Sequence, residues 1–288
     1  MNFKILSNVC LKDFCTFKIG GSAKFLCVAY STTALINVCK YCKAHNIKYK
    51  IIGLGANLLF DDYGYNGMII VNKTHNFVFR KNFVYVQSGA NVTSLIMQCC
   101  NHSLSGFENL AGIPSTIGGA VVNSLGAFDT IFSDYIEYVE CYHKDKLDKK
   151  IKLTHEQCKF GYRSSIFKND DYIITRVKLI LKQDDKTLIQ QKIKEAIEKK
   201  RTTQPLDMPS AGSVFKRGNI IPAKAIDELG LKATKIGGAE ISTKHAGFIV
   251  NTDSATSKDV KDLIKLIQKK IKIAYNEDLE SEIEFVEY

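Results

Sequence analysis

The chain has 288 residues, 45% hydrophobic and 24% charged, which is ordinary for a soluble globular protein that buries one large or two medium domains. No stretch approaches the roughly 18 continuous apolar residues of a membrane span, and the first residues lack a run of signal-peptide length. The nine cysteines show no regular spacing, which fits a reducing compartment. We therefore expect a cytoplasmic protein without membrane partners.

The formal net charge of +10 fits two classes of protein. It is typical of a nucleic-acid-binding protein, and it is also typical of a lysine-rich background around a pocket for a phosphorylated ligand. The lysines share helices with Asp and Glu and form no long basic run with interleaved aromatic residues. The pattern favours the second class, so we expect no nucleic-acid partner, and a basic nucleic-acid-binding protein stays as the alternative.

The first predicted helix covers residues 31–46. Its apolar residues Leu35, Val38, Cys39 and Cys42 recur at i, i+3, i+4 and i+7 after a Ser/Thr cap. The two cysteines form a CxxC pair on this stripe, which predicts packing in the core. A redox or metal role would need a helix N-terminus or a second ligand pair.

The central part of the sequence predicts an α+β arrangement. Strand patterns cover 64–72 and 82–90, and helical spacing returns at 92–101. The stretch 106–128 holds five of the 19 glycines and predicts a loop-rich surface where the backbone approaches a ligand closely.

The last part of the chain predicts two strands, two helices and a final strand. Strands are expected within 135–144 and at 171–181, and a linking helix over 184–201 would bury Ile189, Ile193 and Ile197. A second helix over 256–276 would bury a stripe of Val260, Leu263, Ile264, Ile267 and Ile271, and 279–288 alternates like a strand. We place a domain boundary within 183–203.

Two glycine-containing loops are candidates for phosphate binding. In GLGANLL (residues 53–59), Gly53 and Gly55 permit close backbone approach with bare N–H groups, and Asn57 can adopt a left-handed turn or donate from its side chain. The alternative is a tight turn between strands. GIPSTIGGA (112–120) offers a second such loop, with Thr116 and the amides of Gly118 to Ala120 as expected contacts.

The decapeptide PSAGSVFKRG (209–218) raises the question of what Ser213 does. A nucleophilic serine usually occupies a G-x-S-x-G turn, and position 215 here is Phe. A serine that caps a backbone amide in a turn is the simplest alternative.

Four stretches together resemble the UDP-N-acetylenolpyruvoylglucosamine reductase (MurB) family. They are GLGANLL, GIPSTIGGA, GYRSSIF (161–167), and PSAGSVFKR with IGGAEISTKHAGFIVN (209–217 and 236–251). The likeness runs from about Thr16 to about Glu287, and the segment after Arg163 is similar to the compact subtype that lacks an extra tyrosine-bearing loop.

This resemblance implies an α+β fold in which an FAD-binding domain of the vanillyl-alcohol-oxidase/PCMH type precedes an α+β substrate-binding domain. The implied domains are an N-terminal extension (1–16), the FAD-binding domain (17–182, with subdomains of about 17–75 and 76–182), the linker helix (183–203) and the substrate-binding domain (204–288).

The implied activity is reduction of an enolpyruvyl sugar nucleotide to UDP-N-acetylmuramate during synthesis of peptidoglycan precursors. Non-covalent FAD would be the cofactor and NADPH the reductant, and we expect a monomer whose partner is the small-molecule substrate. Another FAD oxidoreductase of the same fold with a different substrate is the alternative among enzymes.

Three catalytic residues follow from the resemblance. Arg163 would stabilise negative charge beside the substrate carboxylate, Ser213 would be the proton donor, and Glu282 would orient a water or assist that proton transfer. Without the resemblance, Arg163 would be a surface residue beside Tyr162. The alternation of LESEIEF would place Glu282 on a solvated edge with Glu280 and Glu284.

The resemblance also implies two sets of binding residues. Those for FAD are Gly53, Gly55, Ala56, Asn57, Leu58, Gly112, Ile113, Pro114, Thr116, Gly118, Gly119 and Ala120. Those for the substrate are Tyr162, Lys216, Arg217 and Lys244, of which we favour Arg217 first; Lys235 is a further cation nearby, and His245 is expected to be structural. The sequence departs from the family pattern at Ser115, Ser124 and Leu125, which leaves flavin contacts at these three positions open.

Overall fold

The structure is a computed structural model that describes residues 3–169 and 171–288. The chain divides into two compact units, each assembled from separate stretches of sequence. The first unit comprises the chain up to Ile5, Cys27–Gly53 and Ile69–Lys199, and the second comprises Leu6–Leu26, Leu54–Met68 and Lys200–Tyr288. The domain borders predicted from the sequence, at residues 16/17, 182/183 and 203/204, stay a prediction.

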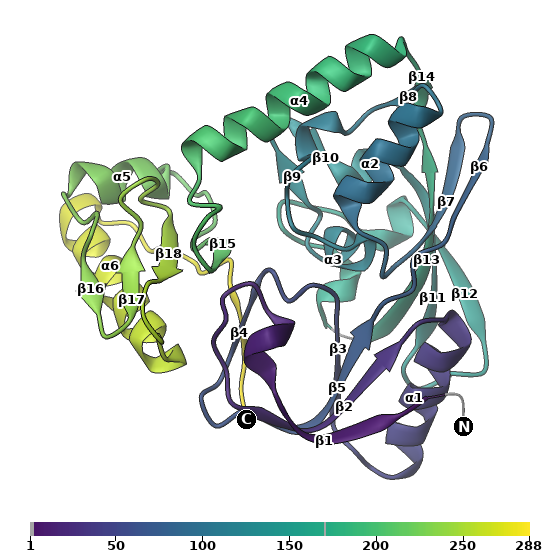
Figure 1. The fold of residues 1–288 in the computed structure, drawn as a ribbon, viewed down its shortest axis with the longest axis horizontal. Coiled ribbons are helices and arrows are strands. Elements are labelled where there is room, and N and C mark those ends of the chain that lie inside the picture. Colours follow the sequence, from purple (N-terminus) through teal and green to yellow (C-terminus); the bar gives the residue numbers. More distant parts are fainter. Residues whose placement is uncertain (1–2, 170) are drawn as a thin grey trace. The chain divides into compact units, whose positions relative to one another are not determined.

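The first unit is built on a five-stranded antiparallel sheet in the order β12-β11-β13-β7-β6 (Figure 1). Its strands are β6 (Phe77–Arg80), β7 (Phe83–Gln87), β11 (Ile136–His143), β12 (Lys150–Thr154) and β13 (Tyr172–Ile180). Alternate residues of the central strands, such as Val84 and Val177, pack in one core with α2 (Val92–Asn101) and α3 (Ile117–Val122). The strands expected at 82–90 and 171–181 and the helix expected at 92–101 are confirmed.

The glycine-dense stretch 106–128 differs from its prediction as a loop, because it contains α3. Thr116 caps this helix by accepting a hydrogen bond from the Gly119 amide at 3.3 Å. Ile117, Ala120 and Val121 are fully buried, so tertiary packing and the cap outweigh the poor helix propensity of two adjacent glycines. The short strands β9 (Gly126–Ala127) and β10 (Thr130–Ile131) follow it.

The CxxC pair lies on α1 (Thr32–Ala44), which stands between β2 and β3 in the chain. Both strands belong to a four-stranded sheet with the order β1-β2-β5-β3. These strands are β1 (Ile5–Cys10), β2 (Ser22–Ala29), β3 (Tyr49–Ile52) and β5 (Tyr65–Asn72). Ser31 caps α1, and Leu35, Val38, Cys39 and Cys42 are fully buried as predicted. Burial, with a contribution from nearby Cys27, raises the pKa of Cys42 to about 11, which disfavours the reactive thiolate.

Replacing both Cys39 and Cys42 with alanine is expected to lower the free energy of unfolding by about 1–2 kcal/mol per site, because each change removes a buried sulfur. Turnover per folded, flavin-loaded molecule should stay unchanged. Urea unfolding and steady-state assays measure the two effects, and Cys10→Ala at an exposed thiol is the matched control. A collapse of turnover in folded protein would contradict a purely structural role.

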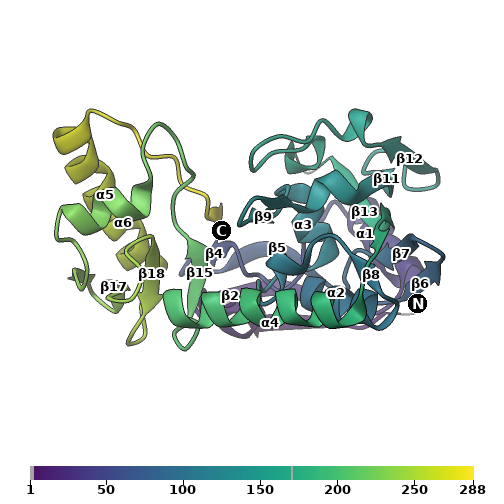
Figure 2. The ribbon, with the colours of Figure 1, turned by 90° about the horizontal axis from the view of Figure 1, so that it is seen from above.

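The linking helix is α4 (Lys186–Thr203), which Figure 2 shows as one continuous helix. Ile189 and Ile193 are buried as predicted, whereas Ile197 is 37% exposed. The buried stripe continues instead through Ala196 and Lys200, because a spacing of four residues drifts around a helix of 3.6 residues per turn. The pair β8 (Leu104–Ser105) and β14 (Lys182–Gln183) precedes α4.

The second unit contains a four-stranded antiparallel sheet in the order β15-β18-β17-β16. Its strands are β15 (Ser210–Ser213), β16 (Lys235–Ile236), β17 (Ala239–Ile241) and β18 (Phe248–Asn251), and its helices are α5 (Pro222–Glu228) and α6 (Ser257–Tyr275). The stripe predicted for α6 is buried throughout, and a capping box between Thr256 and Asp259 starts the helix.

The end of the chain forms a parallel pair rather than a long strand. β19 (Glu284–Val286) pairs with β4 (Leu58–Phe60), and only Ser281 among the preceding residues makes a bridge, to Phe215. Within the described ranges, no helix combines the length and the apolar content needed to cross a membrane.

Candidate active site

The two predicted flavin loops meet within the first unit at Gly53. A Cβ added at Gly53 would lie 2.3 Å from the hydroxyl oxygen of Thr116, so any side chain here would displace the cap of α3. The contact explains why a glycine stands at this position. The pairing of the two loops could not be read from either motif alone.

The backbone of residues 53–57 offers a run of open donors. Across the described part of the chain, no acceptor takes a hydrogen bond from the amides of these five residues. Gly55 has a left-handed φ of +64°, and a Cβ there would lie 2.2 Å from the carbonyl oxygen of Phe14. Successive amides around a left-handed residue form a concavity that binds anions, so this segment fits a pyrophosphate.

Asn57 has a different contact from the one expected for a flavin ligand. Its side-chain nitrogen donates to the carbonyl oxygen of Glu282 at 2.8 Å, and its own carbonyl accepts from the Glu284 amide at 2.9 Å. Asn57 therefore links GLGANLL to the C-terminal strand, 225 residues away in sequence.

The amides of the second loop are largely used within the protein. The Gly118 amide donates to the Ser88 carbonyl at 2.7 Å, and the Ala120 amide donates to the Thr116 carbonyl at 2.8 Å. Gly112 has a φ of +83° and donates to the Thr93 hydroxyl at 3.0 Å. The amides of this loop thus bind acceptors of the protein itself and do not form a row of free donors.

The three atypical residues make contacts inside the protein. The Ser115 hydroxyl donates to the Thr116 carbonyl at 3.0 Å. Ser124 is buried with its hydroxyl 3.1 Å from that of Ser133, and Leu125 packs against the core. These contacts give each residue a structural role.

Arg163 lies in a strained turn of the first unit. Gly161 and Ser164 exchange two backbone hydrogen bonds of 3.0 and 3.1 Å, and Arg163 between them has a φ of +51°, which is unusual for a non-glycine residue. One guanidinium nitrogen donates to the Gly126 carbonyl at 3.1 Å, and the group lies 5.5 Å from the exposed ring of Tyr162.

Ser165, which the sequence analysis did not single out, fastens this turn to α3. Its hydroxyl donates to the Val122 carbonyl at the end of the helix, at 2.8 Å. The turn that carries Arg163 and the helix that Thr116 caps are therefore attached to each other. The one sequence signal for this structural role of Ser165 was its position within the GYRSSIF motif.

Ser213 ends β15 in the second unit with an exposed side chain. A β-bulge between Ser210 and Ser213 and a φ of +78° at Gly212 turn the strand just before it. In the part of the chain that the structure describes, the Ser213 hydroxyl makes no hydrogen bond, so it does not cap a turn amide. The hydroxyl is accessible to a ligand.

Glu282 differs from the two neighbouring glutamates. Glu280 and Glu284 are exposed as the alternation predicted, but Glu282 is half-buried. Its amide donates to the Val214 carbonyl at 2.7 Å, which places its backbone beside the residue that follows Ser213. The second unit therefore brings Ser213 and Glu282 onto adjacent backbone segments.

The predicted substrate-binding cations occupy the same unit. Lys216 forms an ion pair with Glu280, and the Lys244 ammonium donates to the Arg201 carbonyl at 2.6 Å. Arg217 is exposed on the loop after Phe215, and Lys235 lies 2.9 Å from Glu240.

His245 has the contacts of a structural residue. Its Nδ1 accepts from the Gly247 amide at 3.1 Å, and its ring packs against Phe248 with centroids 4.9 Å apart. Burial lowers its pKa, so the ring is neutral and works as a fixed acceptor.

Residues 23–145 match the family described as FAD binding domain, and the amides of residues 53–57 fit the pyrophosphate of such a cofactor. The class is therefore a flavoprotein with a second α+β domain. Residues 204–286 match the family described as UDP-N-acetylenolpyruvoylglucosamine reductase, C-terminal domain. The chain belongs to the UDP-N-acetylenolpyruvoylglucosamine reductase (MurB) family, which confirms the resemblance seen in the sequence motifs.

Relatives of the same name cover nearly the whole chain. The UDP-N-acetylenolpyruvoylglucosamine reductase of Caldicellulosiruptor bescii is 39% identical over 280 residues, which are 96% of this chain and 88% of that protein. That of Caldanaerobacter subterraneus is 36% identical over 285 residues, 98% of this chain and 94% of the relative. The crystal structure of MurB from Thermus caldophilus matches 99% of both chains at 31% identity, with a TM-score of 0.83.

Proposed function

We propose that this protein is an NADPH-dependent flavoenzyme that reduces UDP-N-acetyl-3-O-(1-carboxyvinyl)-glucosamine to UDP-N-acetylmuramate in peptidoglycan precursor synthesis. The observation that carries the proposal is the accessible Ser213 hydroxyl on the segment whose next residue, Val214, binds the Glu282 amide, in the region that matches the family's C-terminal domain. Another FAD oxidoreductase with a different substrate would have no need of these features outside the flavin domain.

The residues present fit FAD. The open amides of 53–57 suit its pyrophosphate, and the family resemblance assigns further FAD contacts to the loop that begins at Gly112. Bound FAD supplies the hydride chemistry, accepting from NADPH and donating to the substrate. We propose non-covalent binding through the two loops.

Arg163 would serve the substrate carboxylate. Hydride addition to the terminal vinyl carbon leaves negative charge on the adjacent carbon and its carboxylate, which a guanidinium can bind with two parallel hydrogen bonds. The bond to the Gly126 carbonyl and the turn from Gly161 to Ser164 hold the group before substrate arrives, so little reorganisation is needed.

Ser213 would then give its proton to the carbon that carries the negative charge, and Glu282 would orient a water or assist this transfer. Arg217, Lys216, Lys244 and Tyr162 are proposed to bind the diphosphate and sugar. Lys216 and Lys244 would exchange their present partners for the substrate. Arg217 is the first candidate because its side chain is exposed and a guanidinium can bind a phosphate through two hydrogen bonds.

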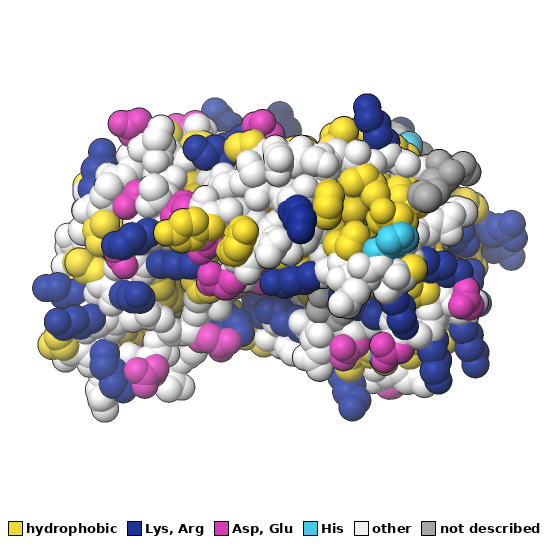
Figure 3. Space-filling view, turned by 90° about the horizontal axis from the view of Figure 1, so that it is seen from below, with side chains coloured by type: hydrophobic (Ala, Val, Ile, Leu, Met, Phe, Trp, Pro, Cys, Tyr) yellow, Lys and Arg dark blue, Asp and Glu magenta, His cyan; other side chains and the backbone are white. Residues whose placement is uncertain are grey.

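We also propose that the enzyme works in the cytoplasm as a monomer. All nine cysteines are thiols, which fits a reducing compartment. On the face drawn in Figure 3, lysines and arginines are dispersed among acidic and uncharged side chains instead of forming one basic patch, which argues against the nucleic-acid-binding alternative.

The purified protein is expected to be yellow, and acid precipitation should leave the colour in the supernatant. Anaerobic NADPH should bleach the flavin absorbance, and the enolpyruvyl sugar nucleotide should then restore it. Bleaching without recovery would point to the alternative oxidoreductase, and protein without any flavin band would contradict the whole assignment.

A further inference from the structure

The segment from Glu280 to Glu284 is held along both of its edges within the second unit. On one edge, the Lys216 amide donates to the Glu280 carbonyl at 2.9 Å, and the Glu282 amide donates to the Val214 carbonyl at 2.7 Å. On the other edge, Asn57 binds both the Glu282 carbonyl and the Glu284 amide. Glu282 is therefore fixed at its own N–H and its own C=O.

The strand pair that continues this segment is short. β19 and β4 pair over only three residues, and a two-stranded pair of that length is marginal by itself. A slip of one residue would move the residues of β19 by about 3.3 Å along the strand, and Glu282, two residues before the strand, would be displaced with them. Contacts at the far ends of the two strands therefore add to the hydrogen bonds of residues 280–284 in fixing the register of this pair.

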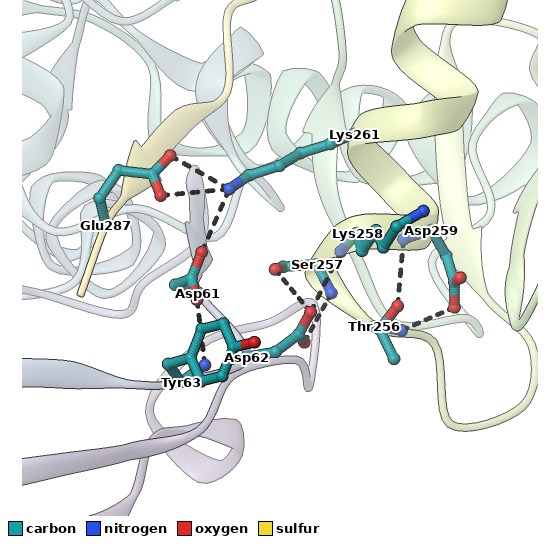
Figure 4. Close-up of polar contacts among 9 residues, drawn as sticks. All are labelled: Asp61, Asp62, Tyr63, Thr256, Ser257, Lys258, Asp259, Lys261 and Glu287. Carbon is teal, nitrogen blue, oxygen red and sulfur yellow. Dashed lines mark hydrogen bonds and ion pairs between the residues drawn. The ribbon is translucent and has the colours of Figure 1, made fainter.

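Lys261 of α6 binds an acidic residue at the end of each of these strands, as Figure 4 shows. Its ammonium lies 3.2 Å from an oxygen of Asp61, which follows β4, and 3.1 and 3.2 Å from the two carboxylate oxygens of Glu287, which follows β19. The Asp61 amide also donates to the Val286 carbonyl at 3.0 Å. The ammonium thus cross-links the ends of both strands in one register.

The first turn of α6 is anchored at the neighbouring residue of the same loop. The Asp62 carboxylate accepts from the amide and the hydroxyl of Ser257 at 2.8 and 2.9 Å, and from the Lys258 amide at 3.2 Å (Figure 4). This bond set fixes the helix against the loop that carries Asp61. Lys261, one turn further along α6, is held at the strand ends.

The Asp61 arm of the cross-link is partly protected from solvent, whereas Glu287 is 63% exposed. The side chains of Lys261 and Asp61 are only 27% and 15% exposed, so water and salt screen their attraction less than that of a surface pair. Burial opposes the charge of Lys261, but hydrogen bonds with Glu287 and Asp61 outweigh it and raise the pKa. A backbone hydrogen bond from Tyr63 lowers the pKa of Asp61, so both groups are charged at neutral pH.

We propose that Lys261 is a positioning residue: by binding Asp61 and Glu287 it sets the register of the C-terminal strand, and so the place of the Glu282 carboxylate relative to Ser213. The inference rests on the proposed function for the catalytic role of Glu282. Lys261 acts only through that residue.

The test compares Lys261→Gln and Glu287→Gln with Lys265→Gln, in the flavin-loaded enzyme. Lys265 is the matched control, since it is one turn along the same helix, 76% exposed, and pairs only loosely with Asp262 at 4.0 Å. Hydrogen exchange at the Glu282 and Glu284 amides should speed up at least tenfold in the first two variants and not in the control. Flavin reoxidation by substrate should slow on the order of tenfold to a hundredfold, as a misplaced catalytic group predicts.

Reduction of the flavin by NADPH should keep its wild-type rate, and Lys261→Arg should restore most of the reoxidation rate because it keeps the charge. In a Glu282→Gln background, Lys261→Gln should cause no further loss. Unchanged amide protection in both Lys261→Gln and Glu287→Gln overturns the register role, and additive losses in the double variant overturn action through Glu282.

The rate of flavin reoxidation in Glu282→Gln alone tests the catalytic role of Glu282 separately from the register role of Lys261. A wild-type rate would count against the first and leave the second to be decided. It would overturn the proposed role of Glu282 and the catalytic part of this inference, while the exchange rates would still decide whether Lys261 holds the strand. If Lys261→Gln does not fold, Glu287→Gln carries the test, because that carboxylate is 63% exposed and its loss leaves Lys261 bound to Asp61.

Discussion

Replacing Ser213 with alanine is expected to slow reduction of the enolpyruvyl substrate on the order of 10²–10⁴-fold, because the reaction loses a positioned proton donor. FAD should stay bound, and NADPH should still reduce it at nearly the wild-type rate, since that half-reaction does not use the hydroxyl. The expectation depends on an exposed hydroxyl that makes no hydrogen bond in the described part of the chain. Stopped-flow traces of both half-reactions measure the difference.

Two further variants make the test specific. Ser213→Cys should retain part of the activity, because a thiol can also give up a proton. Ser210→Ala, at the other end of the same short strand, is the matched control and should leave both half-reactions unchanged. A normal reoxidation rate in Ser213→Ala would show that Ser213 is not the acid, and equal losses in both half-reactions would indicate a structural role.

The helices were predictable where a local repeat decides burial. The stripes of α1 and α6 recur every three or four residues, and each helix buries the side chains that this repeat selects. α4 follows the repeat only as far as Ile193, after which Ala196 and Lys200 replace Ile197. The residue types along a helix do not show at which residue the buried stripe shifts to a neighbouring row of side chains.

The short helix α3 was not predictable from local sequence. Gly118 and Gly119 lower helix propensity, and what holds the helix is the Thr116 cap together with burial of Ile117 and Val121 against the five-stranded sheet. Propensity was outweighed by contacts with residues distant in sequence.

The site was predictable residue by residue but not as an arrangement. The motifs pointed to Asn57, Ser213 and Glu282 separately, each with a plain structural alternative. Only the fold shows that Asn57 holds the Glu282 carbonyl and that the Glu282 amide binds the residue after Ser213. Bonds between positions more than 60 residues apart leave no spacing signal in the sequence.

The second large effect is expected at Arg163, where lysine should not substitute. A lysine keeps the charge but loses the planar fork that binds a carboxylate through two hydrogen bonds. It also changes the donor that binds the Gly126 carbonyl. We expect Arg163→Lys to slow substrate reduction by roughly 10²–10³-fold, the usual cost of removing one preorganised stabiliser of transition-state charge.

The backbone of Arg163 makes this comparison clean. Its φ of +51° costs any non-glycine residue about the same, so the backbone strain is equal in both proteins. Arg163→Lys should therefore lower the free energy of unfolding by no more than about 1 kcal/mol, the usual contribution of the one altered hydrogen bond. Arg176→Lys, at a half-exposed position 4.0 Å from Glu140, is the matched control and should keep full activity. The readouts are urea unfolding, NADPH-driven flavin reduction and substrate-driven reoxidation. Because the charge develops only during reaction with the substrate, only the rate of reoxidation should fall. Reoxidation of the lysine variant at the wild-type rate would show that a point charge suffices and that the guanidinium geometry has no part in the chemistry.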